Sequence, residues 1–364
     1  MKIEIVSFTG DSGIADYAVS LARALVPIAQ VTVVSSNTLP DRFDNLGFSV
    51  ARVFRRTRHY PVDIFRFIAG VLHRRPNWVL LQGSLKFPPL DALVVRVLRL
   101  FGVSMAVTIH DVLPHYPSVW SKTLYGFYFR SFNRVVVHSK AALFAVRAMG
   151  VTVKVLTVPH GIYDIFKLTG VSQKEARKQI GQLTDKDFVI LFFGNLEPRK
   201  GLIPFLDAAA ALTKFNDIKF VLAGENCLNS HAAFYSAQLD AARSLPNVLV
   251  HDERIAFENV ENYFSACDVV ALPYLEGTTS GVLKLALAFE KPVVATRAGD
   301  FPEQVPVGAG LFIDNNSAIV PALCEALLAV RAQPVKFTRA MAAAVLDAQW
   351  SEIAARLLSH LDSK

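Results

Sequence analysis

The spacing of hydrophobic residues along the chain predicts strands that alternate with helices. Short apolar runs recur, and segments long enough for a helix separate them. Each such alternation predicts a parallel sheet covered by helices on both faces. In the first half the runs lie at residues 1–8, 31–35, 78–82, 103–109, 134–137 and 153–158, and in the second half at residues 188–193, 219–223, 248–251, 269–272 and 292–295.

The pattern stops near residues 159–169, a segment with Pro, Gly and polar residues, and then starts again. The chain has 364 residues, and at about 150 residues per domain that length corresponds to two domains. We therefore expect an α/β protein with two Rossmann-like, doubly wound domains, residues 1–162 and 163–344.

Composition supports a folded protein in a reducing compartment. Hydrophobic residues make up 52% and charged residues 19% of the chain, which is far from a disordered composition. An odd number of widely spaced cysteines, Cys227, Cys267 and Cys324, argues against a disulfide framework and favours reduced core residues. We expect a cytoplasmic location, because the first residues do not resemble a signal peptide and the longest apolar stretches are interrupted by Arg66, Asp91, Arg96 and Arg99.

The net charge of +7 is distributed unevenly. Residues 1–150 contain 18 basic and 8 acidic side chains, whereas residues 151–364 contain 20 and 23. Residues 51–150 alone contain 15 basic and 3 acidic side chains. This segment predicts an anionic partner, or else a solvated basic face.

Two candidate sites follow strands of the first half. The Gly10–Tyr17 turn opens a helix and is either a structural glycine turn or a place where backbone N–H groups meet an anion, with Gly13 closest to a ligand. It lacks the G-x-G-x-x-G spacing of dinucleotide-binding folds. His110, at the end of a buried strand, is expected to donate a hydrogen bond to a substrate hydroxyl, with Asp111 beside it, or to cap a neighbouring helix. His138 and His160 also end strands, but Ser139 is interpreted as an N-cap and Gly161 as a tight turn.

Two further sites follow strands of the second half. The first, Gly194–Gly201, carries Arg199 and Lys200 at a predicted helix start, where charge and N–H donors together suit a diphosphate. A solvated Arg-Lys pair is the alternative. The second, Pro273–Val282, offers the N–H groups of another helix start, and Glu276 can accept hydrogen bonds from sugar hydroxyls. Two such loops in one domain predict a ligand with two phosphates and several hydroxyls.

In their order along the chain, these motifs resemble the retaining glycosyltransferases of GT-B architecture, specifically glycosyltransferase family 4. The resemblance covers nearly the whole chain and rests on residues 12–17, 108–111, 137–139, 159–161, 197–201 and 273–296. It implies an acceptor-binding N-terminal domain and a C-terminal domain that binds a nucleotide sugar. It also implies that residues 345–364 form a helix that packs back on the N-terminal domain.

The family implies a role for each site residue. Arg199 and Lys200 would bind the diphosphate, Glu276 the donor sugar, and His110 would reach that sugar from the N-terminal domain. No protein nucleophile, metal or cofactor is expected, since the departing phosphate helps to deprotonate the acceptor and the enzyme stabilises the leaving diphosphate. The positions expected to contact the donor are Gly13, Gly194, Arg199, Lys200, Thr279, Ser280, Gly281 and Val282.

The chain departs from the family motif at one position. The usual second Glu, eight positions after the first, is replaced by Lys284. Ribose recognition must therefore differ from that of the family.

The basic N-terminal half suits a lipid-linked or membrane-held saccharide acceptor, as in exopolysaccharide or cell-surface glycan synthesis. Residues 55–75 and 120–134 interleave cations with aromatic and aliphatic side chains, the mixture typical of a protein on an anionic membrane. We expect a peripheral protein at the inner face of the cell membrane. Nucleic acid is not an expected partner.

Two other interpretations stay open. A nicotinamide-dependent sugar-nucleotide epimerase or dehydrogenase would also open with strand, Gly turn and helix, but it predicts a Tyr-x-x-x-Lys pair, and Leu21 and Phe129 stand four residues after Tyr17 and Tyr125. A non-enzymatic polyanion binder would explain the basic half but not the diphosphate-like loops of the acidic half.

Overall fold

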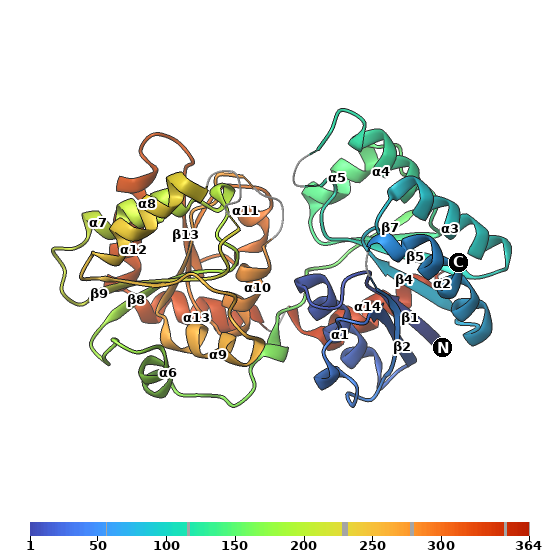
Figure 1. Ribbon diagram of the computed structural model, residues 1–364, viewed down its shortest axis with the longest axis horizontal. Coiled ribbons are helices and arrows are strands. Elements are labelled where there is room, and N and C mark those ends of the chain that lie inside the picture. The colour runs from blue at the N-terminus through green and yellow to red at the C-terminus, as the bar shows by residue number, and fades with distance from the viewer. Residues whose placement is uncertain (56, 115–116, 228–231, 277–279, 346–347, 364) are drawn as a thin grey trace. The chain divides into compact units, whose positions relative to one another are not determined.

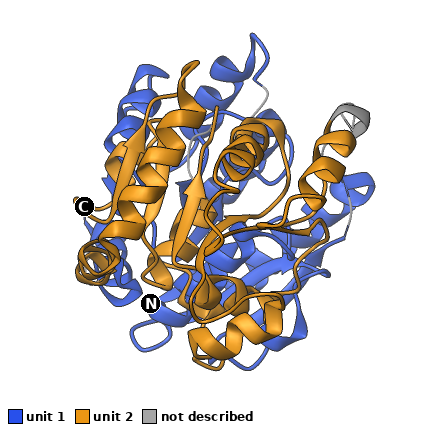
Figure 2. Cartoon of the chain, turned by 90° about the vertical axis from the view of Figure 1, so that its left-hand side faces the viewer, with its two compact units in different colours: residues 1–161, 348–364 blue, residues 162–347 orange. Residues whose placement is uncertain are grey.

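The computed structural model describes residues 1–364 except 56, 115–116, 228–231, 277–279, 346–347 and 364 (Figure 1). The chain divides into two compact units (Figure 2). Unit 1 consists of Met1–Gly161 and Ala348–Lys364, and unit 2 of Ile162–Asp347. The expected division after residue 162 lies one residue from this boundary.

Unit 1 contains a seven-stranded sheet in the order β3-β2-β1-β4-β5-β6-β7, and every neighbouring pair is parallel. The order runs outward in both directions from β1 and β4, so the sheet is doubly wound. The strands are β1 (Lys2–Val6), β2 (Gln30–Ser36), β3 (Ser49–Phe54), β4 (Trp78–Gln82), β5 (Ser104–Ile109), β6 (Arg134–Val137) and β7 (Lys154–Thr157).

The handedness of parallel crossovers decides which helices cover which face of this sheet. Right-handed connections place α2 to α5 on one face and α1 on the other, and side chains of α2 to α5 share one core cluster. Figure 1 shows α2 and α3 across the sheet from α1. The C-terminal helix α14 joins α1, so the end of the chain belongs to unit 1. The helices are α1 (Gly13–Leu25), α2 (Tyr60–Arg74), α3 (Pro88–Leu100), α4 (Ser121–Phe129), α5 (Lys140–Ala148) and α14 (Trp350–Asp362).

The core between the sheet and α2–α5 is apolar and encloses two carboxylates. Phe67, Val107 and Phe132 are among its fully buried side chains. Asp63 is buried and accepts hydrogen bonds from the backbone and guanidinium of Arg55. Asp91 is also buried, and it accepts from the Tyr60 hydroxyl and the backbone of residue 86. Both acidic residues of these helices are thus held inside.

Unit 2 contains a six-stranded parallel sheet in the order β10-β9-β8-β11-β12-β13. The order reverses between β8 and β11. The strands are β8 (Phe188–Phe193), β9 (Ile218–Ala223), β10 (Val248–His251), β11 (Val269–Leu272), β12 (Val293–Thr296) and β13 (Gly310–Ile313). Its helices are α6 (Gln173–Ile180), α7 (Leu202–Ala211), α8 (Ala232–Arg243), α9 (Phe257–Ala266), α10 (Gly281–Ala288), α11 (Phe301–Gln304), α12 (Ile319–Ala332) and α13 (Pro334–Val345).

The structure confirms the predicted fold class, two doubly wound α/β units, and also corrects two details. The hydrophobic pattern did not predict β3 and β13, each of which is one of the two edge strands of its sheet. Of the three cysteines, Cys267 is buried and Cys324 is partly buried against the core of unit 2, whereas Cys227 is half-buried and is not part of that core. None of the helices described in the structure is long and apolar enough to cross a bilayer.

Candidate functional site

The two polar loops of unit 2 meet at the point where its strand order reverses. Gly194–Gly201 follows β8 and Pro273–Ser280 follows β11, the two neighbouring strands at the switch point. Ligands of open parallel sheets bind at the carboxyl ends of such strands. The Arg199 carbonyl joins the loops, because it accepts hydrogen bonds from the backbone N–H of Leu275 at 2.7 Å and of Glu276 at 3.2 Å. The motifs at residues 197–201 and 273–276 therefore form one structural unit.

Glycines allow this close approach. Gly201 has a left-handed φ of 76°, and a Cβ there would lie 1.9 Å from the carbonyl oxygen of Pro273. Gly194 has a φ of 90°, and a Cβ there would lie 3.3 Å from Lys200 Nζ and 3.4 Å from Val282 Cγ2. The structure thus brings together three of the predicted donor-site residues, Gly194, Lys200 and Val282.

Lys200 is the most perturbed cation of this loop. Its side chain is only 8% exposed. Burial lowers the pKa of Lys200 from 10.5 to about 8, while the neighbouring Glu197 acts in the opposite direction. A bound anion stabilises the charged form of such a poorly solvated ammonium, because it replaces the hydration that burial removed.

Arg199 differs from Lys200 because it already has an acidic partner. Its Nε donates to Glu197 Oε2 at 2.6 Å. The local structure also corrects one expectation, since residues 198–200 form a 3-10 turn and the regular helix α7 begins only after Gly201.

Helix α10 begins with a serine N-cap, Ser280. Ser280 Oγ accepts a hydrogen bond from the backbone N–H of Leu283 at 3.4 Å and lies 3.1 Å from the Tyr274 hydroxyl. The Ser280 hydroxyl is therefore occupied by the cap, and Gly281 is exposed beside it. Glu276 is exposed as well. Thr279, which sequence analysis assigned to the donor, lies outside the described residues.

Lys284, which stands in the place of the family's second Glu, points into the body of unit 2. Its side chain is 1% exposed, and its Nζ donates to the side-chain oxygen of Gln304. Burial lowers the pKa of Lys284 to about 8, and the nearby Asp300 opposes that shift. In this structure the residue connects α10 to α11.

In unit 1, His110 lies at the end of β5 within a group of aromatic rings. Its Nε2 lies 3.2 Å from Gln82 Oε1, so the Gln82 side chain holds the ring by a hydrogen bond. The Tyr17 ring is 4.6 Å away in an edge-to-face contact. Burial lowers the pKa of His110 to about 4, with Asp111 acting in the opposite direction. His110 is therefore a neutral imidazole at physiological pH.

His138 and His160 belong to the same group, with ring centroids 5.3 and 6.0 Å from that of His110. Ser139 caps α5, as expected, because its hydroxyl accepts from the N–H of residue 142 at 3.0 Å. The tight-turn interpretation of Gly161 was wrong. A Cβ on Gly161 would lie 2.4 Å from the Trp350 ring, so a glycine is required there by packing of α14.

Sequence analysis missed two residues of this group. Tyr17 is fully buried, and its ring contacts those of His110 and Trp350. Gln82 ends β4 and is buried, and its amide nitrogen has no hydrogen-bond partner within the described part of the chain. The available signal was a polar residue at the end of the apolar run 78–81.

The Gly10–Gly13 turn has a structural explanation at one of its glycines. A Cβ on Gly10 would lie 2.2 Å from the backbone nitrogen of Leu39. Ser12 caps α1 by accepting from the N–H of Ala15 at 3.3 Å. Gly13 is exposed in the first turn of α1, at the carboxyl edge of the sheet.

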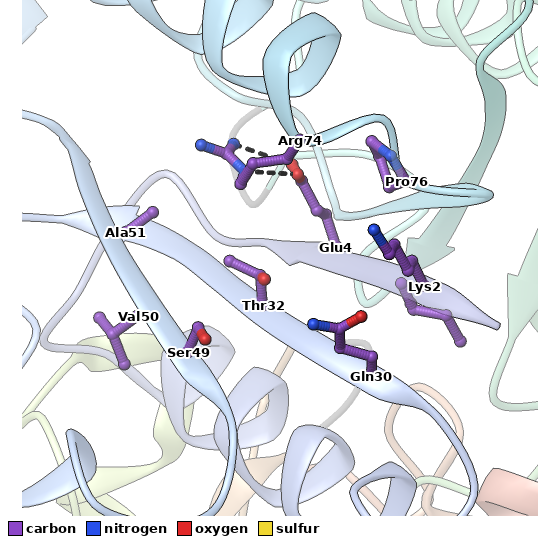
Figure 3. Close-up of a pocket in the computed structure, with 10 residues that line it drawn as sticks. Lys2, Glu4, Gln30, Thr32, Ser49, Val50, Ala51, Arg74 and Pro76 are labelled. Carbon is purple, nitrogen blue, oxygen red and sulfur yellow. Dashed lines mark hydrogen bonds and ion pairs between the residues drawn. The ribbon is translucent and has the colours of Figure 1, made fainter.

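A polar hollow of about 320 Å³ lies elsewhere in unit 1, at the amino ends of β1 to β3 (Figure 3). Its buried carboxylate, Glu4, is paired with Arg74 at 2.6 Å. The hollow is thus at the opposite sheet edge from His110. Among the described residues, no group of three or more His, Cys, Asp or Glu side chains is arranged to hold a metal ion.

Comparison with known proteins identifies the family of each half. Residues 12–161 match the model of the Glycosyl transferase 4-like domain, and residues 187–345 match that of Glycosyl transferases group 1. A D-inositol 3-phosphate glycosyltransferase of Pseudarthrobacter chlorophenolicus is 29% identical over 202 residues, which are 54% of this chain and 47% of the relative. The chain thus aligns with about half the length of the curated relatives it matches.

Solved structures share the complete fold. HepE of Anabaena in complex with UDP and glucose superposes with a TM-score of 0.78 at 17% identity, with all of each chain covered. Sucrose-phosphate synthase of Thermosynechococcus elongatus gives a TM-score of 0.76 at 18% identity and covers 99% of this chain and 98% of its own. At this identity the likeness establishes the GT-B architecture. Together with the two domain matches, it shows that the chain belongs to the GT-B glycosyltransferases with family 4-like domains.

Proposed function

We propose that this protein is a retaining hexosyltransferase that moves a sugar from a nucleotide-sugar donor to a lipid-linked or membrane-held saccharide acceptor. The observation that carries the proposal is the junction of the two loops at the β8–β11 switch point. There the Arg199 carbonyl joins the loops and Lys200 lies against Gly194. Both domain matches and the UDP and glucose in the HepE complex support a nucleotide-sugar donor.

The diphosphate of the donor would bind beside Lys200. Because the ammonium is buried, few water molecules solvate it, and bound phosphate oxygens would take the place of that water. Charge on the leaving diphosphate increases as the glycosidic bond breaks. A positioned cation that stabilises that charge accelerates the reaction more than it tightens binding of the substrate.

The remaining site residues would contact sugars. Glu276 is exposed next to the loop junction and can accept hydrogen bonds from donor hydroxyls. His110 is neutral and held by Gln82, so its second ring nitrogen would form the hydrogen bond to a sugar hydroxyl.

Retention of configuration would follow from attack on the same face that the diphosphate leaves. In that case an oxygen of the leaving phosphate takes the acceptor proton, the bond from the anomeric carbon to the phosphate oxygen breaks, and the bond to the acceptor oxygen forms. The protein supplies positioning and charge stabilisation for this step.

Two classes of acceptor have support. The basic N-terminal half favours a lipid-linked saccharide held at an anionic membrane, as in cell-surface or exopolysaccharide synthesis. The curated relatives are named for D-inositol 3-phosphate, a small anionic polyol. Transfer measured with a bacterial lipid extract and with inositol 3-phosphate in parallel distinguishes the two.

Thermal unfolding tests the donor proposal first. A ligand that binds only the folded state stabilises it by RT ln(1 + [L]/Kd), which is about 2.7 kcal/mol at a hundredfold excess over Kd. We expect one nucleoside diphosphate among UDP, GDP and ADP, and its sugar conjugate, to raise the melting temperature clearly. NAD should have no effect. Stabilisation by NAD and by none of the nucleoside diphosphates would favour the epimerase or dehydrogenase alternative.

A further inference from the structure

Helix α3 carries apolar side chains on its solvent side as well as on its inward side, next to the exposed Arg96 and Arg99. Its inward side packs in the core through Ala92, Val95 and Leu98. Its outward side carries Leu93, 59% exposed, and Leu100, 86% exposed. Positions 90, 93, 97 and 100 fall on one stripe of a helix with 3.6 residues per turn. Large apolar side chains gathered on the exposed side of a helix and bordered by charged residues mark an interaction surface, so this stripe indicates a partner.

The neighbouring helices extend this surface. Because α2 to α5 pack on the same face of the sheet, we call the outward sides of these four helices the outer face. Phe65 on α2 is 74% exposed and Phe144 on α5 is 72% exposed. Direct contacts connect the layer, since the guanidinium of Arg96 on α3 lies 4.2 Å from the Phe127 ring of α4. Large side chains exposed in such a group mark an interaction surface.

The charge of the outer face has one sign. Asp63 and Asp91 are the acidic residues of α2 to α5, and both are buried. Exposed cations include Arg66 on α2, Lys122 on α4 and Lys140 on α5. Leucine, phenylalanine and cations without carboxylates are the mixture that binds an anionic bilayer. A nucleic acid would use the cations but gain little from exposed leucines.

Several arginines of the basic half are held by acidic side chains or backbone carbonyls. Arg55 is paired with buried Asp63 at 2.7 Å, and Arg74 with buried Glu4 at 2.6 Å. Arg99 and Arg130 donate to the backbone carbonyls of Ser131 and Met149. Part of the positive charge of residues 51–150 therefore stabilises the fold, and substitution of Arg55 or Arg74 would test folding rather than docking.

We propose that the outer face of unit 1 is a docking surface for an anionic lipid bilayer. The inference deepens the proposed function and rests on it, because it assigns the membrane that holds the acceptor to named helices. The N-terminal ends of α3 and α4 lie at the carboxyl edge of the sheet, the edge that carries His110. Phe87 and Trp120, both exposed, are the N-cap residues of these two helices. The bilayer surface would thus reach the edge where unit 1 presents its aromatic group.

Flotation with lipid vesicles tests the proposal on the full chain. We expect the protein to float with vesicles that contain phosphatidylglycerol and to float much less with pure phosphatidylcholine. The triple variant Phe65→Gln, Leu93→Gln, Leu100→Gln should lose at least about tenfold in partitioning, because its apolar contribution is removed. Substituting Gln for Arg66, Lys122 and Lys140 should lower partitioning into the vesicles by about fivefold for each cation removed.

Matched controls exclude general effects of surface substitution. Val307 and Val335 are exposed valines of unit 2, and the double variant Val307→Gln, Val335→Gln should float as the wild type does. Raising the salt from 0.1 to 1 M shortens the screening length from about 10 to about 3 Å. Vesicle binding by the wild type should therefore weaken, whereas binding by the cation variant should change little.

Three results would overturn the proposal. The first is flotation of the apolar triple variant equal to that of the wild type. The second is a wild-type dimer without vesicles that the triple variant abolishes, which would make the outer face an interface between copies of this chain. The third is salt-sensitive binding of duplex DNA with no vesicle binding. Thermal stabilisation by UDP, GDP and ADP, measured on the same samples, separates the two proposals. If a nucleoside diphosphate stabilises the protein but the protein does not float, only the docking proposal is refuted. If the protein floats but no nucleoside diphosphate stabilises it, only the donor-site proposal is refuted.

Discussion

Replacing Lys200 by methionine should make unit 2 more stable and the enzyme inactive. The substitution keeps a long unbranched side chain in a position that is 8% exposed, so it leaves little cavity. Depression of the lysine pKa from 10.5 to about 8 means that folding disfavours the charged form. At about 1.36 kcal/mol per pKa unit, that cost is about 3 kcal/mol at pH 7, and methionine does not incur it.

The extra stability of the Lys200→Met variant should depend on pH. Between pH 8 and 10.5 the unfolded wild type binds more protons at this lysine than the folded protein does, so wild-type stability rises with pH in that window. The advantage of Lys200→Met should therefore be largest below pH 8 and disappear toward pH 10.5. For a unit of this size about 3 kcal/mol corresponds to roughly 6 °C or more in melting temperature.

Activity should change in the opposite direction. Loss of a cation that stabilises the leaving diphosphate should lower kcat by about a hundredfold. Calorimetry at pH 7 and 10 together with steady-state transfer rates measures both effects, and Lys186→Met, at an exposed lysine of the same unit, is the control. A variant that is both less stable and inactive would assign Lys200 to the fold, and a stable variant with activity within twofold of wild type would remove it from the diphosphate site.

Four further predictions concern the donor site. Arg199→Ala should also lower activity, but less than Lys200→Met does, since its guanidinium is already paired with Glu197; a larger loss in steady-state rates would reverse the assignment. Titration calorimetry should show donor affinity falling about fourfold between pH 7 and 8.5, as Lys200 deprotonates in the free protein; constant affinity would contradict its pKa of about 8. Glu276→Gln should lower turnover more than it weakens binding of the free nucleoside diphosphate, and equal losses would move Glu276 to the ribose. Lys284→Glu should destabilise unit 2 by about 3 kcal/mol or more in denaturant titrations, because a buried carboxylate would face Asp300; unchanged stability with tighter donor binding would instead restore the family's ribose contact.

Hydrophobic pattern predicted most of the fold because most strands are buried on both faces. The runs at 78–82, 134–137 and 188–193 coincide with β4, β6 and β8 residue for residue. The two missed strands are edges. In β3 Arg52 points toward solvent and pairs with Asp41 and Asp44, so the apolar run is interrupted where only one side is covered. In β13 the strand is four residues long and mostly half-buried.

The candidate site could be predicted as motifs but not as an arrangement. Sequence reasoning placed Arg199, Lys200 and Glu276 on loops after strands, and the strand order then makes those loops neighbours. Local sequence does not reveal which cations are already paired, because Arg199 and Glu197 close a contact that depends on the turn between them. The same limit applies to Gln82, because its contact with His110 forms only when β4 and β5 are neighbours in the sheet.

The most direct test of the central claim is sugar transfer from a labelled donor. Wild-type protein and Lys200→Met are incubated with UDP-, GDP- and ADP-hexoses that carry a labelled sugar, together with a bacterial lipid extract and, separately, inositol 3-phosphate. The account predicts that the wild type releases one nucleoside diphosphate and transfers the label to an acceptor with retained anomeric configuration, while Lys200→Met does so about a hundredfold more slowly. Absence of transfer from every donor by the wild type, or equal rates for the two proteins, would contradict it.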